Sequence, residues 1–193
     1  MTYCLRWCAA LAIALCAAAV VAAKVKVQTQ YDKKFNFAGL HTYAWHPTGK
    51  GDVKLLQASG ENPAALRERL EPMVVRAVDG ALAKRGFTAA SASPDLNVYY
   101  YVLIGPGISA QTMGQFIAPM PEWGIPPFAP ATSSIDMYEQ GSLIVDLSSP
   151  SLGAMVWRGS ARAEIDRSRS AAEREQRIRD AVDEMFKKFP PKK

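Results

Sequence analysis

Apolar and polar side chains alternate along several stretches of this chain, which is the pattern of β-strands. The clearest stretch is Leu96–Ile104, where an apolar set on one face and tyrosines on the other predict a central strand covered on both faces. Ser142–Leu147 and Ala154–Ile165 lie one short turn apart and predict an antiparallel hairpin. Two further strands are expected nearer the N-terminus, at Val25–Tyr31 and Leu40–His46.

Helical spacing of apolar residues marks a segment between these strands. Asn62 and Pro63 form a helix start, and apolar residues recur every three or four positions up to Leu82. A proline inside a helix removes a backbone donor and clashes with the preceding turn. We therefore expect a kink or a break near Glu71 and a main helix at Pro72–Arg85.

A second helix is expected after Ser170, which forms with Glu173 the sequence pattern of a capping box. Thr48–Gly60 holds three glycines and is expected to be a loop. The order of elements predicts an α/β (α+β) two-layer sandwich. It would have one mixed β-sheet of about five strands and two main helices on the same face.

Residues 105–138 follow no period, and their 34 positions hold six prolines, four glycines and only two charged residues. Methionine and aromatic side chains adapt to partner surfaces, and a proline-rich backbone loses less entropy on docking. This long loop is expected either to grip a partner or lid a cavity, or to fold back over the sheet and complete the core. The residues that we expect to bind a partner are Met113, Phe116, Met120, Trp123 and Phe128.

The first 23 residues predict an export signal. The stretch from Leu5 to Ala23 is apolar except for Arg6, and it ends in small residues of the kind that signal peptidase cuts behind. We expect cleavage after Ala23, which places the rest of the chain in the periplasm. Two alternatives stay open, a lipidated Cys16 and an uncleaved anchor over Trp7–Ala23, and either would hold the protein on the membrane.

Cleavage would leave residues 24–193, which is enough for a single envelope domain with its own core. The cysteines Cys4, Cys8 and Cys16 would all be removed, so no thiol or thiolate metal ligand would remain. Export and a modest positive charge without a basic stripe argue against binding to nucleic acid.

No motif in the sequence predicts a reaction. The patterns of serine hydrolases, phosphate-binding loops and zinc peptidases are absent, and we expect no catalytic residue, no metal site and no cofactor. His41 and His46 are five positions apart on a predicted strand, so they point to opposite faces and do not suit one zinc site. We expect Glu164 and Asp166 to be solvated carboxylates on the surface.

Several short motifs follow one another in a fixed order along the chain. They are Phe35 and Phe37 followed by Thr42-Tyr43-Ala44-Trp45, then Pro94-Asp95-Leu96, Gly141-Ser142-Leu143 with Asp146, Val156-Trp157-Arg158-Gly159, and Phe189-Pro190-Pro191. Together they resemble a family of bacterial envelope proteins, the domain of unknown function 4136. The resemblance implies a small α/β domain, an envelope location and no assigned activity, and it carries no catalytic residue over. Members are typically predicted to be lipoproteins, and this chain departs from that pattern because the bulky Leu15 precedes Cys16.

Our leading hypothesis from the sequence is a non-enzymatic envelope protein that acts as an interaction or accessory module for an unidentified envelope partner. The alternative is a carrier of a lipid or another apolar small ligand, with Tyr99 and Tyr101 among the lining residues. A hydrophobic cavity would favour the carrier and a solid core would count against it. A cleft that brought a histidine together with a carboxylate would favour an enzyme instead.

Overall fold

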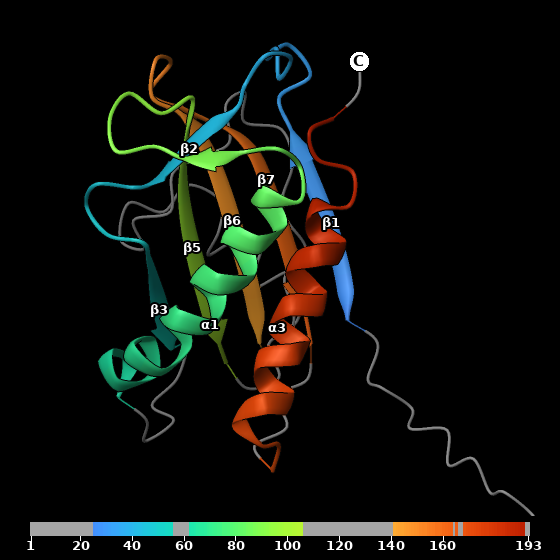
Figure 1. Ribbon diagram of the computed structural model, residues 1–193. Helices are drawn as coiled ribbons and strands as arrows, with labels where there is room; N and C mark the ends of the chain where they lie inside the picture. The colour runs from blue at the N-terminus through green and yellow to red at the C-terminus, as the bar shows by residue number, and fades with distance from the viewer. Residues whose placement is uncertain (1–24, 56–61, 106–140, 164, 166–167, 192–193) are drawn as a thin grey trace, which may run out of the picture.

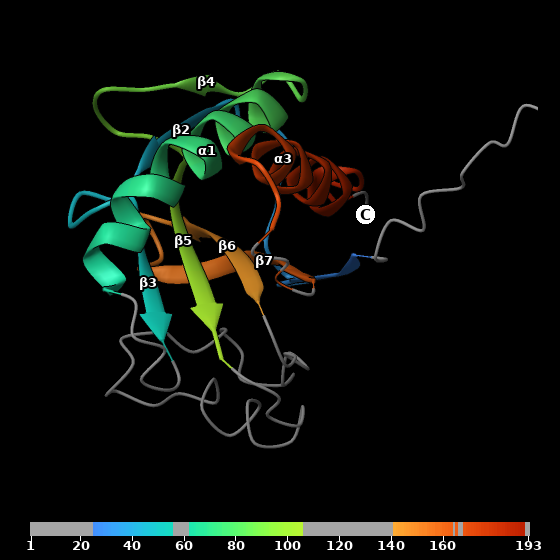
Figure 2. The same ribbon diagram turned by 90° about the horizontal axis from the view of Figure 1, so that it is seen from below.

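The computed structural model describes residues 25–55, 62–105, 141–163, 165 and 168–191. Within them, seven strands form one mixed sheet, and two helices cover one of its faces (Figure 1, Figure 2). The predicted two-layer class is confirmed, with more strands than the expected five. The elements are β1 (Lys26–Tyr31), β2 (Thr42–Trp45), β3 (Gly51–Leu55), α1 (Pro63–Ala83), β4 (Thr88–Ala89), β5 (Leu96–Ile104), β6 (Ser142–Ser149), β7 (Ala154–Arg162) and α3 (Ala171–Phe186).

The sheet is built around β5, and its strand order is β1-β7-β6-β5-β2-β4, with β3 also paired to β5. β6 runs antiparallel to β5 and to β7, which confirms the predicted hairpin. The other edge of β5 carries β2 and then β3, both parallel to it.

The prediction of a loop over Thr48–Gly60 was wrong, because β3 lies within it. Gly51 made this segment look like a loop in the sequence, but the strand requires a glycine there because the Tyr100 ring leaves no room for a side chain. A Cβ there would lie 2.2 Å from the ring of Tyr100 on β5.

Of the kink or break expected near Glu71, the break is wrong, since α1 runs through Pro72 and starts at Pro63. Pro72 is exposed, and the helix continues past it although the proline removes a backbone donor and crowds the preceding turn. The turns ahead of it are held at two points. The Asn62 side chain caps them by accepting the N–H of Ala64 at 2.8 Å, and Leu66 is buried.

α3 starts with the predicted capping box. Ser170 Oγ accepts the backbone N–H of Glu173 at 3.2 Å, and Glu173 Oε2 accepts the N–H of Ser170 at 2.8 Å. Its C-terminal half packs on β7, where the Trp157 ring centre lies 4.7 Å from that of Phe186. Gly159 makes this contact close, because a Cβ there would lie 2.5 Å from the Trp157 ring and 3.1 Å from Met185.

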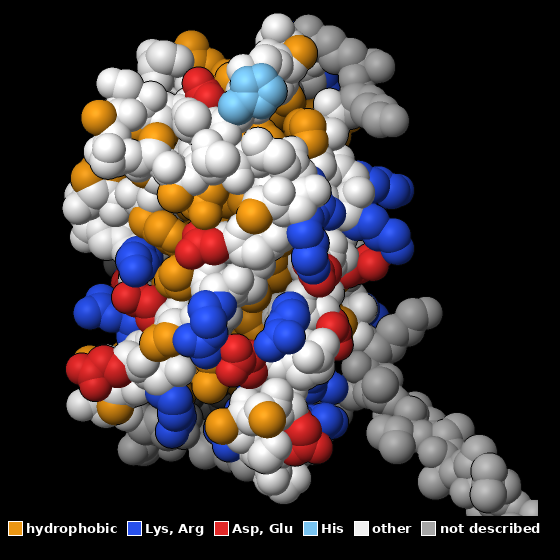
Figure 3. Space-filling model, viewed as in Figure 1, with side chains coloured by type: hydrophobic (Ala, Val, Ile, Leu, Met, Phe, Trp, Pro, Cys, Tyr) orange, Lys and Arg blue, Asp and Glu red, His pale blue; other side chains and the backbone are white. Residues whose placement is uncertain are grey.

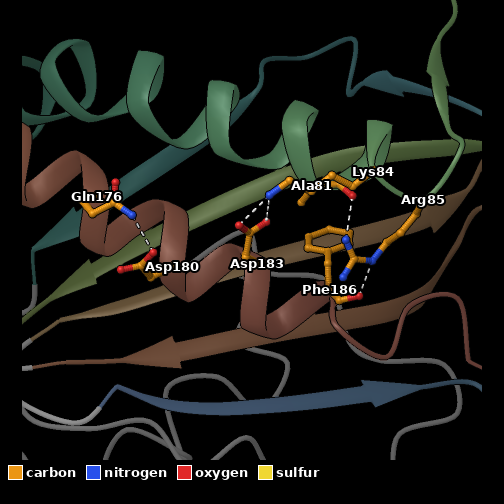
Figure 4. A network of polar contacts seen from close by, with 7 residues as sticks. All are labelled: Ala81, Lys84, Arg85, Gln176, Asp180, Asp183 and Phe186. Carbon is orange, nitrogen blue, oxygen red and sulfur yellow. Dashed lines mark hydrogen bonds and ion pairs between the residues drawn. The ribbon is translucent and has the colours of Figure 1, made fainter.

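The two helices lie side by side and are tied together at their C-terminal ends (Figure 4). Lys84 of α1 donates to Asp183 of α3 at 2.7 Å. Next to this pair, the Arg85 guanidinium donates to the carbonyl oxygens of Ala81 and Phe186. These contacts fix the spacing of the helices at this end.

Asp95, just ahead of β5, holds the start of β2 in place. One of its carboxylate oxygens accepts the backbone N–H groups of His41 and Thr42, each at 2.9 Å, and the Thr42 hydroxyl at 2.8 Å. These three donors, with the His41 N–H first, lower the pKa of the Asp95 carboxyl below its ordinary value.

A buried ion pair links β6 and β7 on the sheet face that the helices do not cover. Both nitrogens of the Arg158 fork donate to the two oxygens of Asp146, each at 2.6 Å, and both residues are 4% exposed. Arg158 lies in the interior of the sheet, because β1 closes the other side of β7.

The first prediction concerns this ion pair. Asp146→Ala should lower the free energy of unfolding by about 3–5 kcal/mol, because it leaves a buried guanidinium without its counter-charge. The double variant Asp146→Leu/Arg158→Met should recover most of that loss in urea unfolding monitored by circular dichroism. A double variant as unstable as the single one would contradict the electrostatic explanation.

The second prediction concerns Asp95. A carboxyl whose pKa is lowered in the folded state contributes stability above its ordinary pKa of about 3.9, and this is lost as the pH falls through the lowered value. The unfolding free energies of the wild type and Asp95→Asn should therefore differ at pH 7 and converge in acid. Asp180→Asn, on the exposed face of α3, controls for the loss of one surface carboxylate. A difference that stays constant down to pH 2 would refute the role of the charge.

Candidate functional site

A groove with a volume of about 400 Å³ lies between α1, α3 and the sheet. It is found where β5 ends, β6 begins, β7 ends and β1 begins, so several separate parts of the chain build it. The helices contribute the residues nearer their N-termini, on the other side from the contacts that tie their C-terminal ends. The groove is therefore the part of the two-layer interface that the helix packing leaves open.

The walls of this groove are mostly aliphatic. The helices contribute Leu66, Leu70 and Val74 from α1, and Ile178 and Ala181 from α3. The sheet and its flanking residues contribute Val25, Val102, Ile104, Leu143, Ala161, Ala163 and Ile165.

The groove has a simple steric origin on β7. The side chains that this strand turns toward the helices are Trp157 and Ala161, with Gly159 between them. The large ring fills the space under the C-terminal half of α3, whereas the alanine leaves space under its N-terminal half. Ala181 faces the groove from the helix side, so small residues meet there on both layers.

Four arginines line the groove, and among its described residues none is acidic. Arg69 comes from α1, Arg169 from the segment before α3, and Arg174 and Arg177 from α3. Elsewhere on the helical layer, positive and negative side chains are interspersed, with hydrophobic side chains visible between them (Figure 3). A mainly apolar groove with a few polar groups is the usual form of a small-molecule site.

Arg174 and Arg177 lie in different surroundings. Arg174 donates from Nε and Nη2 to the carbonyl oxygen of Arg169, at 3.0 and 2.6 Å, and so holds the segment that precedes α3. The Nη2 atom of Arg177 is buried and has no hydrogen-bond partner in the part of the chain that the structure describes. A buried donor in this state is costly, and a bound acceptor would satisfy it.

The five residues expected to bind a partner all lie outside the described residues, so the structure leaves that prediction as it was. They are Met113, Phe116, Met120, Trp123 and Phe128. Glu164 and Asp166 also lie outside the described part.

Tyr99 and Tyr101 do not line this groove. They were expected to line a cavity under the long loop, and because most of that loop lies outside the described residues, this prediction stays as it was. In β5 the side chains of Leu96, Val98 and Tyr100 join the core under the helices, so the two tyrosines at odd positions point to the opposite face. Their rings lie 4.9 Å apart there, and burial together with the nearby Asp146 charge raises the pKa of Tyr101.

Neither histidine lines the groove. His46 Nδ1 lies 2.8 Å from the Thr48 hydroxyl, and His41 meets Asp95 through its backbone N–H. No cluster of three or more His, Cys, Asp or Glu side chains suited to a metal ion occurs among the described residues. Within the same residues, neither helix is long and apolar enough to cross a bilayer.

Sequence reasoning missed the groove and its arginines. The four arginines are spread from position 69 to 177 and have no common motif, so only the packing of α1 beside α3 brings them together. A usable signal was the run of small inward-facing residues on β7, from Gly159 through Ala161 to Ala163.

The fold and groove define a small open α+β sandwich that leaves an apolar groove between its two layers. The model of the family called domain of unknown function DUF4136 matches residues 27–191, and the chain belongs to this family. Neither the family nor its solved member indicates an enzymatic activity. No curated protein matches the chain.

Several solved structures are similar to this chain at low sequence identity. A DUF4136 family protein from Bacteroides thetaiotaomicron is 19% identical with a TM-score of 0.52, over 86% of this chain and 96% of that one. A PDZ domain protein from Parabacteroides distasonis is 14% identical with a TM-score of 0.49, over 88% of this chain and 37% of that one. The PelC dodecamer from Paraburkholderia phytofirmans is 10% identical with a TM-score of 0.40, over 82% of this chain and 96% of that one. The likeness of the family member shows the fold alone, and the other two add nothing to the argument.

Proposed function

We propose that this chain is a non-enzymatic protein of the bacterial cell envelope that binds an apolar small ligand in the groove between its helices and its sheet. The observation that carries the proposal is the groove itself. Its volume of about 400 Å³ lies within the ~300–1,000 Å³ usual for small-molecule sites, which are also mainly apolar.

The walls of the groove support binding over catalysis. Its described residues offer arginines, one serine and aliphatic side chains, with no histidine, carboxylate or thiol. A nucleophile needs a base within hydrogen-bond reach, and this set supplies none. The apolar stretch ahead of Lys24 supports a location in the envelope, and cleavage after Ala23, lipidation at Cys16 and an uncleaved anchor all stay compatible with it.

The third prediction tests the groove with N-phenyl-1-naphthylamine, an uncharged probe that fluoresces in apolar surroundings. The wild type should bind it saturably. Ile178→Trp should lose most of this binding, because the indole would occupy the space between α3 and the sheet.

Ala172→Trp is the matched control, since Ala172 is exposed in the first turn of the same helix and does not line the groove. It should bind the probe as the wild type does. Binding that survives in Ile178→Trp would place the site elsewhere, and no binding by the folded wild type would end the proposal.

The interaction module remains a second proposal, carried by the composition of residues 105–138. The structure makes it testable, because β5 and β6 stay paired up to Leu103 and Ser142. A short connection can therefore replace the long one without moving either strand.

The fourth prediction is that deleting Gly107–Ser134 leaves a folded domain that no longer captures a partner protein from detergent-solubilised envelopes. Circular dichroism of the deletion variant measures whether it folds. Cross-linking of the wild type and of the variant to envelope proteins measures whether each captures a partner. Loss of folding would show instead that the segment completes the core. Unchanged capture would exclude it as the binding surface.

A further inference from the structure

Among the described residues, every charged side chain that lines the groove is an arginine, and this restricts what the groove can bind. Arg69, Arg169, Arg174 and Arg177 line it, and no aspartate or glutamate does so among its described residues. Positive charges beside an apolar wall produce a stronger potential than the same charges in open water. A neutral apolar ligand would use the walls but not this potential.

Arginines on the outer surface of the same two helices have different partners from Arg177 in the groove. Arg179 of α3 is half exposed and lies 3.6 Å from Glu175, and Arg76 of α1 donates to the same carboxylate at 3.0 Å. The arginines on this surface thus meet an acidic partner from the protein. Arg177, two residues before Arg179, turns into the groove instead and leaves the buried Nη2 atom without a hydrogen-bond partner in the described chain.

Arg174 and Arg177 are placed so that both can bind the same anionic group of a ligand, at one end of the groove. They lie three residues apart on α3, so they share a face of the helix. Arg174 donates to the backbone carbonyls of Arg169 and Ser170, and because these acceptors are neutral they do not compensate its charge. The aliphatic residues Ile178 and Ala181 continue along the same helix toward the core.

We propose that the groove binds an anionic amphiphile, whose apolar chain lies along Ile178 and the sheet and whose carboxylate or phosphate head is held by Arg177 and Arg174. This rests on the proposed function and adds the chemistry of the ligand. A carboxylate and a phosphate share the planar oxygen pair that a guanidinium binds through two parallel hydrogen bonds. The head group supplies the acceptor that Arg177 Nη2 lacks.

Four ligands with the same twelve-carbon chain test the inference on the purified full chain, below their micelle-forming concentrations. They are dodecanoate, dodecyl phosphate, dodecanol and dodecyltrimethylammonium, each used to displace N-phenyl-1-naphthylamine. The two anions should bind about 10- to 100-fold more tightly than the alcohol, as expected for hydrogen bonds to a charged group. The cation should bind most weakly, and the better of the two anions identifies the head group.

Arg177→Gln should remove most of the preference for the anions and leave the affinity for dodecanol unchanged. Arg179→Gln, which removes the same charge from the outer face of the same helix, should keep the preference. The four-ligand comparison on the wild type needs no variant, so it stands even where Arg177→Gln does not fold.

Equal affinities of the wild type for dodecanol and dodecanoate would overturn the assignment of the head group and leave the apolar site intact. The same would follow from an equal loss of preference in Arg177→Gln and Arg179→Gln. Failure of all four ligands and of the probe would overturn the proposed function as well.

Discussion

The docking of α3 on β7 is the contact on which the other features depend. Trp157 is 1% exposed and packs against Phe186. Because Gly159 has no side chain, Met185 of α3 can pack directly on the backbone of β7. This fixes the height and rotation of α3 over the sheet. An α-helix rises 1.5 Å per residue, so Arg177 then lies about 13 Å back along the axis from Phe186. The position of the groove arginines thus follows from an aromatic contact at the other end of the helix.

The same contact explains why the interior is open at one end. Protein cores are packed to nearly crystalline density, so a groove persists only where no available side chain fills the space. Aromatic rings fill the layer beneath the C-terminal half of α3. Further toward its N-terminus, the sheet offers Ala161 and the helix Ala181, and both of these small residues line the groove. At the other end, Lys84 and Asp183 join the two helices. The groove is a product of side-chain size along one strand together with a fixed helix pair.

Local sequence patterns predicted the elements whose burial follows a period, and failed where pairing partners decide the structure. Leu96–Ile104 has alternation strong enough to set its bounds without help. Gly51–Leu55 has no such signal and becomes a strand because the free edge of β5 accepts its hydrogen bonds. Pro72 does not end α1, because the turns before and after it are held by the Asn62 cap and by the buried Leu66 and Val74. The groove could not be predicted at all, because residues as distant as Arg69 and Arg177 meet only through the packing of the two layers.

The motifs that mark the family also have structural explanations in this chain. Tyr43 and Trp45 both donate to Asp79 of α1, at 2.8 and 3.0 Å, so the second strand is bound to the first helix. Asp95 holds the start of that strand, and Asp146 neutralises a buried arginine on the other face of the sheet. These motif residues build the scaffold, and none of them lines the groove. The family motif Gly141-Ser142-Leu143 does line the groove, but its four arginines lie outside the motifs. Membership of the family therefore accounts for the fold, whereas the charge of the ligand must be inferred from arginines that the motifs do not include.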